Sequence, residues 1–135
     1  MALSLINALC TSTHFIIPAV FDRLGVQTIP FFLKKFKQLQ AALFPHSKLL
    51  GVIANRTRGS KLTPSEMEVM QRIKQQGTDA WGEMIDTFDC QSIPNHVAIS
   101  ASEGPAYMDS PEIRQIFDEV GTAFLAKFGV PPPAV

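Results

Sequence analysis

The sequence has few cysteines, no long apolar run and no excess of charge of either sign. Its two cysteines, Cys10 and Cys90, lie far apart with no C-x-x-C spacing and no grouped histidine, which argues against a zinc site or a disulfide framework. This cysteine usage fits a reducing, cytoplasmic setting. No apolar stretch reaches the length of a membrane-spanning helix, so we expect no membrane partner. Twelve basic residues balance twelve acidic ones, which excludes a general attraction to nucleic acid or anionic lipid but leaves room for local patches.

A phosphate-binding loop is also absent from these residues. The eight glycines are scattered, and the segment RGSKLT holds Lys61 without the G-x-x-x-x-G-K-[ST] pattern around it. Phosphoryl transfer needs the backbone amides of such a loop, its lysine and metal-holding carboxylates. We therefore expect this chain alone not to hydrolyse a nucleoside triphosphate.

Other catalytic groupings are weak. No spacing brings Cys10 together with His14, His46 or His96, and each has a plainer interpretation: Cys10 lies on an apolar helix face and is expected in the core, and His96 is expected in a solvated loop. In the segment DTFDC, Asp86 and Asp89 are expected on opposite faces of a strand, which is poor geometry for a carboxylate pair. No catalytic or metal-binding residue is predicted.

The hydrophobic periodicities predict one α/β domain over residues 1–129, followed by a proline-rich tail over 130–135. Thr63, Pro64 and Glu66 mark a capped helix start, Gly77 its stop, and Ser110 and Pro111 another start. The expected elements are helices over 2–9, 31–44, 64–76 and 111–128, strands over 14–19 and from residue 49, and a weaker strand over 84–90. This alternation is typical of mostly parallel strands flanked by helices.

The stretch LLGVIANRTRG ends an apolar strand in polar residues. Ligands of parallel sheets gather beyond the carboxyl ends of the strands, so Asn55, Arg56 and Thr57 are expected at a ligand-binding edge. A plainer alternative is that Asn55 ends the strand in a turn and the arginines are solvated.

Three segments, LINALCTSTHFIIPA, LLGVIANRTRG with its capped helix, and IPNHVAISASEGPA, resemble in order and spacing the second half of ParA-type ATPases. MinD-like and other deviant Walker A proteins share much of this half. The resemblance covers nearly all of residues 3–128. It implies a partial P-loop NTPase-like sheet without the preceding phosphate-loop half, and ATP and Mg²⁺ as cofactors only when that half is supplied. It also implies a short helix before the final one.

The resemblance assigns roles to individual residues. Asn55 would face the adenine with Arg56 beside it, while Pro94 and Asn95 would line the other side of the base. Pro94 could instead merely end a strand, and Asn95 cap a turn. Relatives contact DNA without sequence preference through basic residues of this half, and the candidates here are Lys34, Lys35, Lys37, Arg56, Arg58 and Lys61.

Two features argue against DNA contact. Ala98 stands where many relatives have arginine, and lysines on a helix are usually its solvated face. The resemblance further implies a homo-oligomer, a ParB-like partner or another partner that covers an exposed sheet edge. The alternative function is a non-catalytic interaction module of the same fold, and the alternative assembly is a monomer with a smaller, complete sheet.

Overall fold

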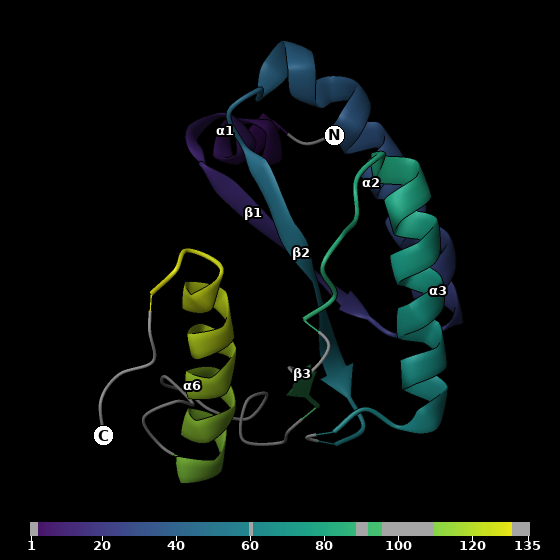
Figure 1. Cartoon of the computed structure of the whole chain (residues 1–135), viewed down its shortest axis with the longest axis vertical. Helices are drawn as coiled ribbons and strands as arrows, with labels where there is room; N and C mark the ends of the chain where they lie inside the picture. The colour runs from purple at the N-terminus through teal and green to yellow at the C-terminus, as the bar shows by residue number, and fades with distance from the viewer. Residues whose placement is uncertain (1–2, 60, 89–91, 96–109, 131–135) are drawn as a thin grey trace.

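The computed structural model describes residues 3–59, 61–88, 92–95 and 110–130. These residues form an α/β fold in which three parallel strands lie in the order β1-β2-β3 (Figure 1). The elements are α1 Leu3–Thr11, β1 His14–Val20, α2 Arg23–Leu43, β2 Lys48–Thr57, α3 Pro64–Trp81, β3 Ser92–Pro94 and α6 Pro111–Ala126. The predicted class, parallel strands flanked by helices, is confirmed. Within the described ranges no helix is long and apolar enough to cross a bilayer.

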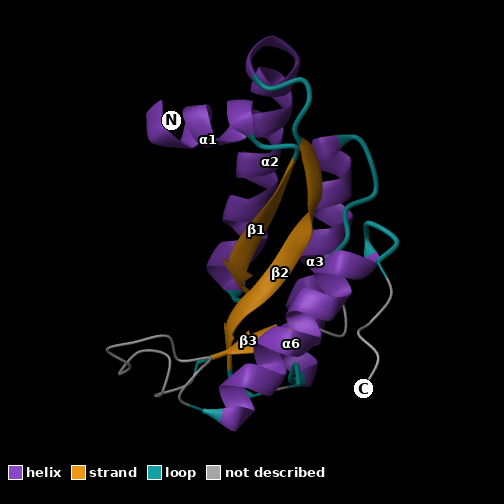
Figure 2. Ribbon diagram, turned by 90° about the vertical axis from the view of Figure 1, so that its left-hand side faces the viewer, coloured by secondary structure: helices purple, strands orange, loops and turns teal. Residues whose placement is uncertain are grey.

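The helices cover both faces of the sheet. Helices α2 and α3 lie together on one face, and α6 lies on the other (Figures 1 and 2). The main core forms beneath α2 and α3, where the ring of Phe15 makes edge contacts with Phe36, Phe44 and Trp81 at centroid distances of 6.0, 6.5 and 6.2 Å. A smaller set of buried apolar side chains lies outside this cluster: Ile53, Phe88, Ile113 and Ile116. Strand β2 is therefore buried on both faces, as its apolar run predicted.

Helix α2 begins at Arg23 rather than at Phe31, so the predicted start was wrong. The carboxylate of Asp22 accepts a hydrogen bond from the amide of Gly25 at 2.8 Å, which caps the first turn, and the helix continues through Pro30. Proline inside a helix removes one backbone hydrogen bond, and a long apolar face can outweigh that loss. The buried side chains of Val26, Ile29 and Leu33 supply this face on both sides of the proline.

Helix α3 starts as predicted but ends later. Glu66 N donates to Thr63 Oγ1 at 3.2 Å and Thr63 N donates to Glu66 Oε1 at 3.0 Å, so the capping box is confirmed. The helix passes through Gly77 and ends at Trp81, with Gly82 in the left-handed region at φ 87°. Gly77 was wrongly predicted as the stop. It serves close packing instead, because a Cβ there would lie 2.5 Å from Cδ1 of Ile85.

The third strand is Ser92–Pro94, and the prediction of a strand over 84–90 was wrong for its described part, residues 84–88. In that segment the carbonyl of Asp86 accepts a hydrogen bond from the amide of Val52 at 2.8 Å. Phe88 has a φ of 50°, which interrupts the extended conformation a strand needs. Residues 89 and 90 lie outside the described ranges, so the predicted relation between Asp86 and Asp89 does too.

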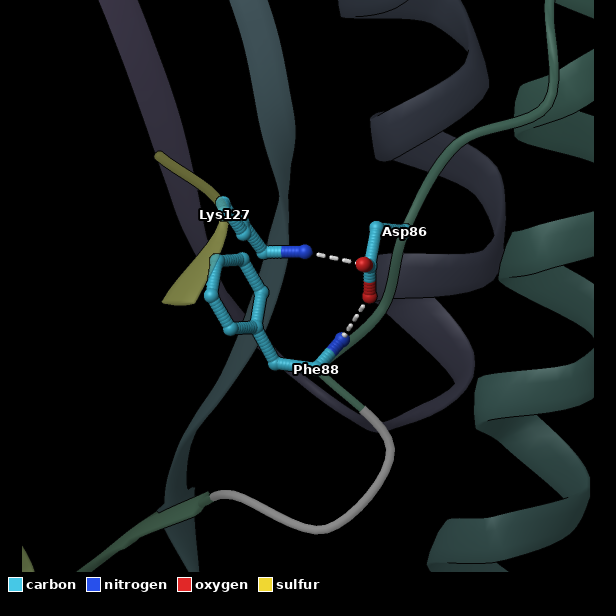
Figure 3. Close-up of polar contacts among 3 residues, drawn as sticks. All are labelled: Asp86, Phe88 and Lys127. Carbon is cyan, nitrogen blue, oxygen red and sulfur yellow. Dashed lines mark hydrogen bonds and ion pairs between the residues drawn. The ribbon is translucent and has the colours of Figure 1, made fainter. Parts of the chain in front are cut away.

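Helix α6 is capped as predicted, with Ile113 N donating to Ser110 Oγ at 3.4 Å, and Gly129 follows it with a φ of 73°. The residue that follows its last turn, Lys127, contacts the segment 84–88 (Figure 3). Lys127 Nζ forms an ion pair with Asp86 and lies 4.4 Å from the ring centroid of Phe88, whose amide donates to Asp86 Oδ1 at 2.7 Å. Partial burial raises the pKa of Asp86, but the hydrogen bonds from Lys127 and Phe88 outweigh it, and the net pKa lies below the ordinary value. This ion pair joins the residue that follows α6 to the segment 84–88, which bonds to β2 through the carbonyl of Asp86.

Candidate functional site

The polar end of β2 lies at the carboxyl edge of the sheet, between the ends of its two neighbours. Asn55 pairs in register with Val20 of β1 and with Ile93 of β3. Its side chain is half-buried, and its Oδ1 accepts the amide proton of Arg56 at 3.0 Å. The remaining lone pair of Oδ1 and the side-chain NH₂ are available to a ligand.

Arg56 is an extra residue in the pairing of β2 with β3. The register passes from Asn55 opposite Ile93 to Thr57 opposite Pro94, and Arg56 takes the left-handed conformation with a φ of 56°. Such a bulge changes the direction of a side chain at the end of a strand. The guanidinium of Arg56 is exposed, while Thr57 is buried and donates its hydroxyl proton to the carbonyl of Gly59 at 2.8 Å.

The four residues predicted on the base side of a nucleotide lie at adjoining strand ends. Pro94 stands opposite Thr57, and Asn95 N donates to the carbonyl of Thr57 at 2.9 Å. Pro94 is buried, and Asn95 and Arg56 are exposed. The structure therefore brings Asn55, Arg56, Pro94 and Asn95 together at the edge between β2 and β3.

A cleft of about 730 Å³ opens beside this edge, on the face covered by α2 and α3. It lies between the end of β1, the first turns of α2 and α3, and the residues that follow β2. We call it the arginine cleft, because four of its lining residues are arginines. The residues around it are Val20, Phe21, Asp22, Arg23, Val26, Gln27, Arg56, Arg58, Thr63, Ser65, Glu66, Glu68, Val69 and Arg72.

Two of the three carboxylates around the cleft accept hydrogen bonds from backbone amides. Asp22 caps α2 through its bond from Gly25 N. Glu66 is only 9% exposed, and its second oxygen, Oε2, accepts from the amide of Arg58 at 3.2 Å while Oε1 accepts from Thr63 N. The side chain of Glu66 thus joins the start of α3 to the loop that carries Arg58.

The four guanidiniums form no ion pair or hydrogen bond with any described side chain. All four arginines are exposed. Sequence reasoning selected Arg56 and Arg58 and missed Arg23 and Arg72. Arg23 could have been found, because it follows β1 and the ends of parallel strands share one edge. Arg72 lies two turns into α3, and no local signal in the sequence places it beside the others.

The predicted lysines lie elsewhere. Lys34 and Lys35 are exposed on α2, about 16–18 Å along the helix from Arg23 at about 1.5 Å per residue. Lys37 is engaged, with its Nζ 4.5 Å from the ring centroid of Trp81 and 3.9 Å from a carboxylate oxygen of Glu83. Lys61 is exposed but does not line the cleft. The structure does not join the lysines to Arg56 and Arg58 in one cleft.

The weaker catalytic candidates do not converge. Cys10 is exposed and donates to the carbonyl of Leu43 at 3.0 Å, so its predicted place in the core was wrong. Its helix has one buried residue, Leu9. His14 makes an edge contact with Phe128, His46 is exposed, and His96, Ala98 and the predicted short helix lie outside the described ranges. Among the described residues no group of His, Cys, Asp and Glu is placed to hold a metal ion.

No protein-family model matches this chain, and no curated protein matches its sequence. Interpretation of the site therefore depends on its geometry: a polar edge where β2 and β3 end, and a cationic cleft where β1 and β2 end.

Proposed function

We propose that this chain is the carboxyl-terminal half of a ParA-type partition ATPase, and that the edge between β2 and β3 contacts the base of the nucleotide. The observation that supports this proposal is the convergence of Asn55 with Pro94 and Asn95 at the carboxyl ends of neighbouring parallel strands. Open α/β sheets bind their ligands at this edge.

The chemistry at the edge suits an adenine. The exocyclic amine of adenine is a donor and its ring nitrogens are acceptors, and the amide of Asn55 offers both complements. Pro94 and the aliphatic part of Arg56 can contact the ring, since they adjoin Asn55 in the pairing of β2 with β3. Because these residues supply base contacts and no phosphate loop, the ATP affinity of the chain alone is expected to be weak, and hydrolysis requires the phosphate-loop half and its Mg²⁺.

Titration with adenosine followed by backbone NMR tests this proposal, because weak binding is still visible as a change in chemical shift. Adenosine is expected to shift the amide signals of residues 55–57 and of Asn95. Asn55→Ala should weaken the binding about fivefold, the effect of losing a hydrogen bond of typical net strength. Adenosine is used without phosphates so that the arginines contribute little.

The matched control is Asn7→Ala, which removes an exposed asparagine from α1 on a different element. This variant should bind adenosine as the parent chain does. The proposal is wrong if millimolar adenosine leaves residues 55–57 and 95 unchanged, or if the Asn55 and Asn7 variants respond alike.

Contact with DNA belongs to the same proposal. Its candidates fall into two separate groups. One is the lysines of α2, of which Lys37 already contacts Trp81 and Glu83. The other is Arg56 near the end of β2 with Arg58 and Lys61 after it. Contacts of this kind are made to phosphates, so affinity should be independent of sequence and should fall steeply with salt. Loss of duplex binding in the variant Lys34→Gln with Lys35→Gln would assign this contact to α2.

An interaction module is the second candidate function, favoured by the outer side of β1. Among the described strands β1 pairs with β2 alone, and an apolar groove of about 320 Å³ follows β1 and the first half of α2. Three large apolar side chains that line it are strongly exposed: Val20 at 41%, Leu24 at 63% and Phe32 at 48%. We propose that a second copy of the chain or a partner protein covers this strand edge and groove.

Replacement of Phe32 by glutamate is the direct test of that surface. If the groove is an interface, the parent chain should sediment as an oligomer at micromolar concentration and Phe32→Glu as a monomer, because a buried, unpaired charge is costly. Phe31→Glu is the matched control, since Phe31 is the neighbouring residue and is 67% exposed but does not line the groove. A parent chain that sediments as a monomer would exclude self-association.

A further inference from the structure

We propose that the arginine cleft binds a small phosphorylated molecule that also has an apolar or ring-shaped part. This site adjoins the edge at Asn55 and shares Arg56 with it, and its other residues come from the end of β1, from α2, from the loop after β2 and from α3. The inference does not depend on the assignment to ParA-type ATPases, because charge, shape and hydrogen bonding within the cleft carry it.

The formal net charge of the residues that line the cleft is positive, because four arginines outnumber three carboxylates. The carboxylates of Asp22 and Glu66 already accept hydrogen bonds from backbone amides. Only Glu68 among the three has no such bond. Guanidinium groups present paired donors that match the oxygens of a phosphate, and bonds of this charge-assisted kind are stronger than neutral ones.

The arginines converge from distant parts of the sequence. Arg23 lies in the first turn of α2, Arg56 in the bulge of β2, Arg58 in the following loop and Arg72 on α3. The loop position of Arg58 is fixed, since its amide donates to the buried carboxylate of Glu66. Arginines that are only solvated can lie anywhere on the surface. Binding of a polyvalent anion, in contrast, needs several of them around one cavity.

The shape of the cleft favours a small molecule over duplex DNA. Its volume of about 730 Å³ falls within the usual range of small-molecule pockets. Phe21 and Val26 are each 5% exposed, and with the half-buried Val69 they give the cleft an apolar wall. A duplex presents its phosphates on a convex surface and would reach the arginines at the rim without touching that wall.

Uridine 5′-monophosphate, inorganic pyrophosphate and a short DNA duplex are the probes that test this site. Uridine 5′-monophosphate combines a phosphate with a ring and lacks adenine, so it separates the cleft from the proposed adenine contact. We expect it to bind by calorimetry and to shift the methyl NMR signals of Val26 and Val69. Pyrophosphate should compete with it, since both engage the guanidiniums.

The decisive variant is the double replacement Arg23→Gln with Arg72→Gln, which leaves Arg56 and Arg58 in place. It should weaken uridine 5′-monophosphate by at least about tenfold, the effect of losing a charge-assisted hydrogen bond. Lys34→Gln with Lys35→Gln is the matched control, because it removes the same charge from exposed residues outside the cleft. The control should bind as the parent does.

Thermal unfolding establishes whether the double variant is folded. If it is not, Arg23→Lys with Arg72→Lys takes its place, since lysine keeps the charge but loses the paired donors and should lower affinity. The inference is overturned if uridine 5′-monophosphate does not bind at millimolar concentration, or if the arginine variants bind it as tightly as the parent. It is also overturned if only the duplex binds and the methyl signals of Val26 and Val69 do not move. In that case, loss of duplex binding in the variant Lys34→Gln with Lys35→Gln would assign DNA contact to α2.

Discussion

Gly51→Ala is expected to destabilise the chain by roughly 3 kcal/mol or more, because overpacking against backbone cannot relax by a change of rotamer. A Cβ at position 51 would lie 2.4 Å from the carbonyl oxygen of Asp86 and 2.9 Å from Cε2 of Phe88. The backbone of Gly51 also has a φ of +156°, which residues with a Cβ rarely adopt. A loss of this size is a large fraction of the usual stability of a domain.

Urea unfolding followed by circular dichroism measures this effect as a shift of the transition midpoint. Gly121→Ala is the matched control, since it adds the same methyl group within helix α6 at a position with nothing within 4 Å. Because alanine favours helix more than glycine does, the control should be stabilised by about 0.5–1 kcal/mol. Equal midpoints for the Gly51 variant and the parent would contradict the close approach of β2 to the segment at Asp86.

Glu66→Ala is expected to lower the free energy of unfolding by about 2–3 kcal/mol, through loss of the capping box and of a partner for the Arg58 amide. The carboxylate of Glu66 accepts from both Thr63 N and Arg58 N and is 9% exposed, so water cannot easily replace it. Binding of uridine 5′-monophosphate in the cleft should weaken as well, because the loop that carries Arg58 loses its anchor.

Glu68→Ala is the matched control for Glu66→Ala. Each substitution removes one negative charge from the arginine cleft, but the carboxylate of Glu68 is exposed and accepts no backbone hydrogen bond. On charge alone, both variants should bind the phosphorylated probe more tightly. We expect tighter binding and unchanged stability for Glu68→Ala only, as measured by calorimetry and urea unfolding. If the two variants behave alike, Glu66 has no positioning role.

The elements that could be predicted from the sequence are those with strong local signals. The apolar run before Asn55 and the capping residues Thr63 and Ser110 each act within a few neighbours, and the structure has the corresponding strand and helix starts. The errors came from residues whose role is set by packing against distant parts of the chain. The start of α2 was predicted at Phe31, whereas the helix begins at Arg23 and its packing outweighs the cost of Pro30. Gly77 indicated a helix stop where the structure uses glycine for close contact with Ile85 and Leu33.

One part of the candidate site could likewise be predicted from the sequence, and another part could not. The rule for parallel strands was sufficient to bring Asn55 to the carboxyl edge, and the pairing of β2 with β3 then places Pro94 and Asn95 beside it. The complete arginine cleft could not be predicted, because Arg72 lies on α3 and comes to the cleft only through the packing of α2 against α3. DNA contact stays a prediction for all six candidates: Lys34, Lys35, Lys37, Arg56, Arg58 and Lys61.

The parallel pairing of β1 with β2 also determines how the chain can fold. Parallel strands cannot be joined by a hairpin, so β1 and β2 can meet only after residues 21–47, most of them in α2, have closed a crossover. The entropy of closing that loop is lost before the strand contacts form, which slows folding relative to a protein of local contacts. Early formation of α2 shortens the distance the loop must span. We therefore expect the carboxylate of Asp22, which caps α2 and lines the arginine cleft, to affect the rate of folding as well as the native site.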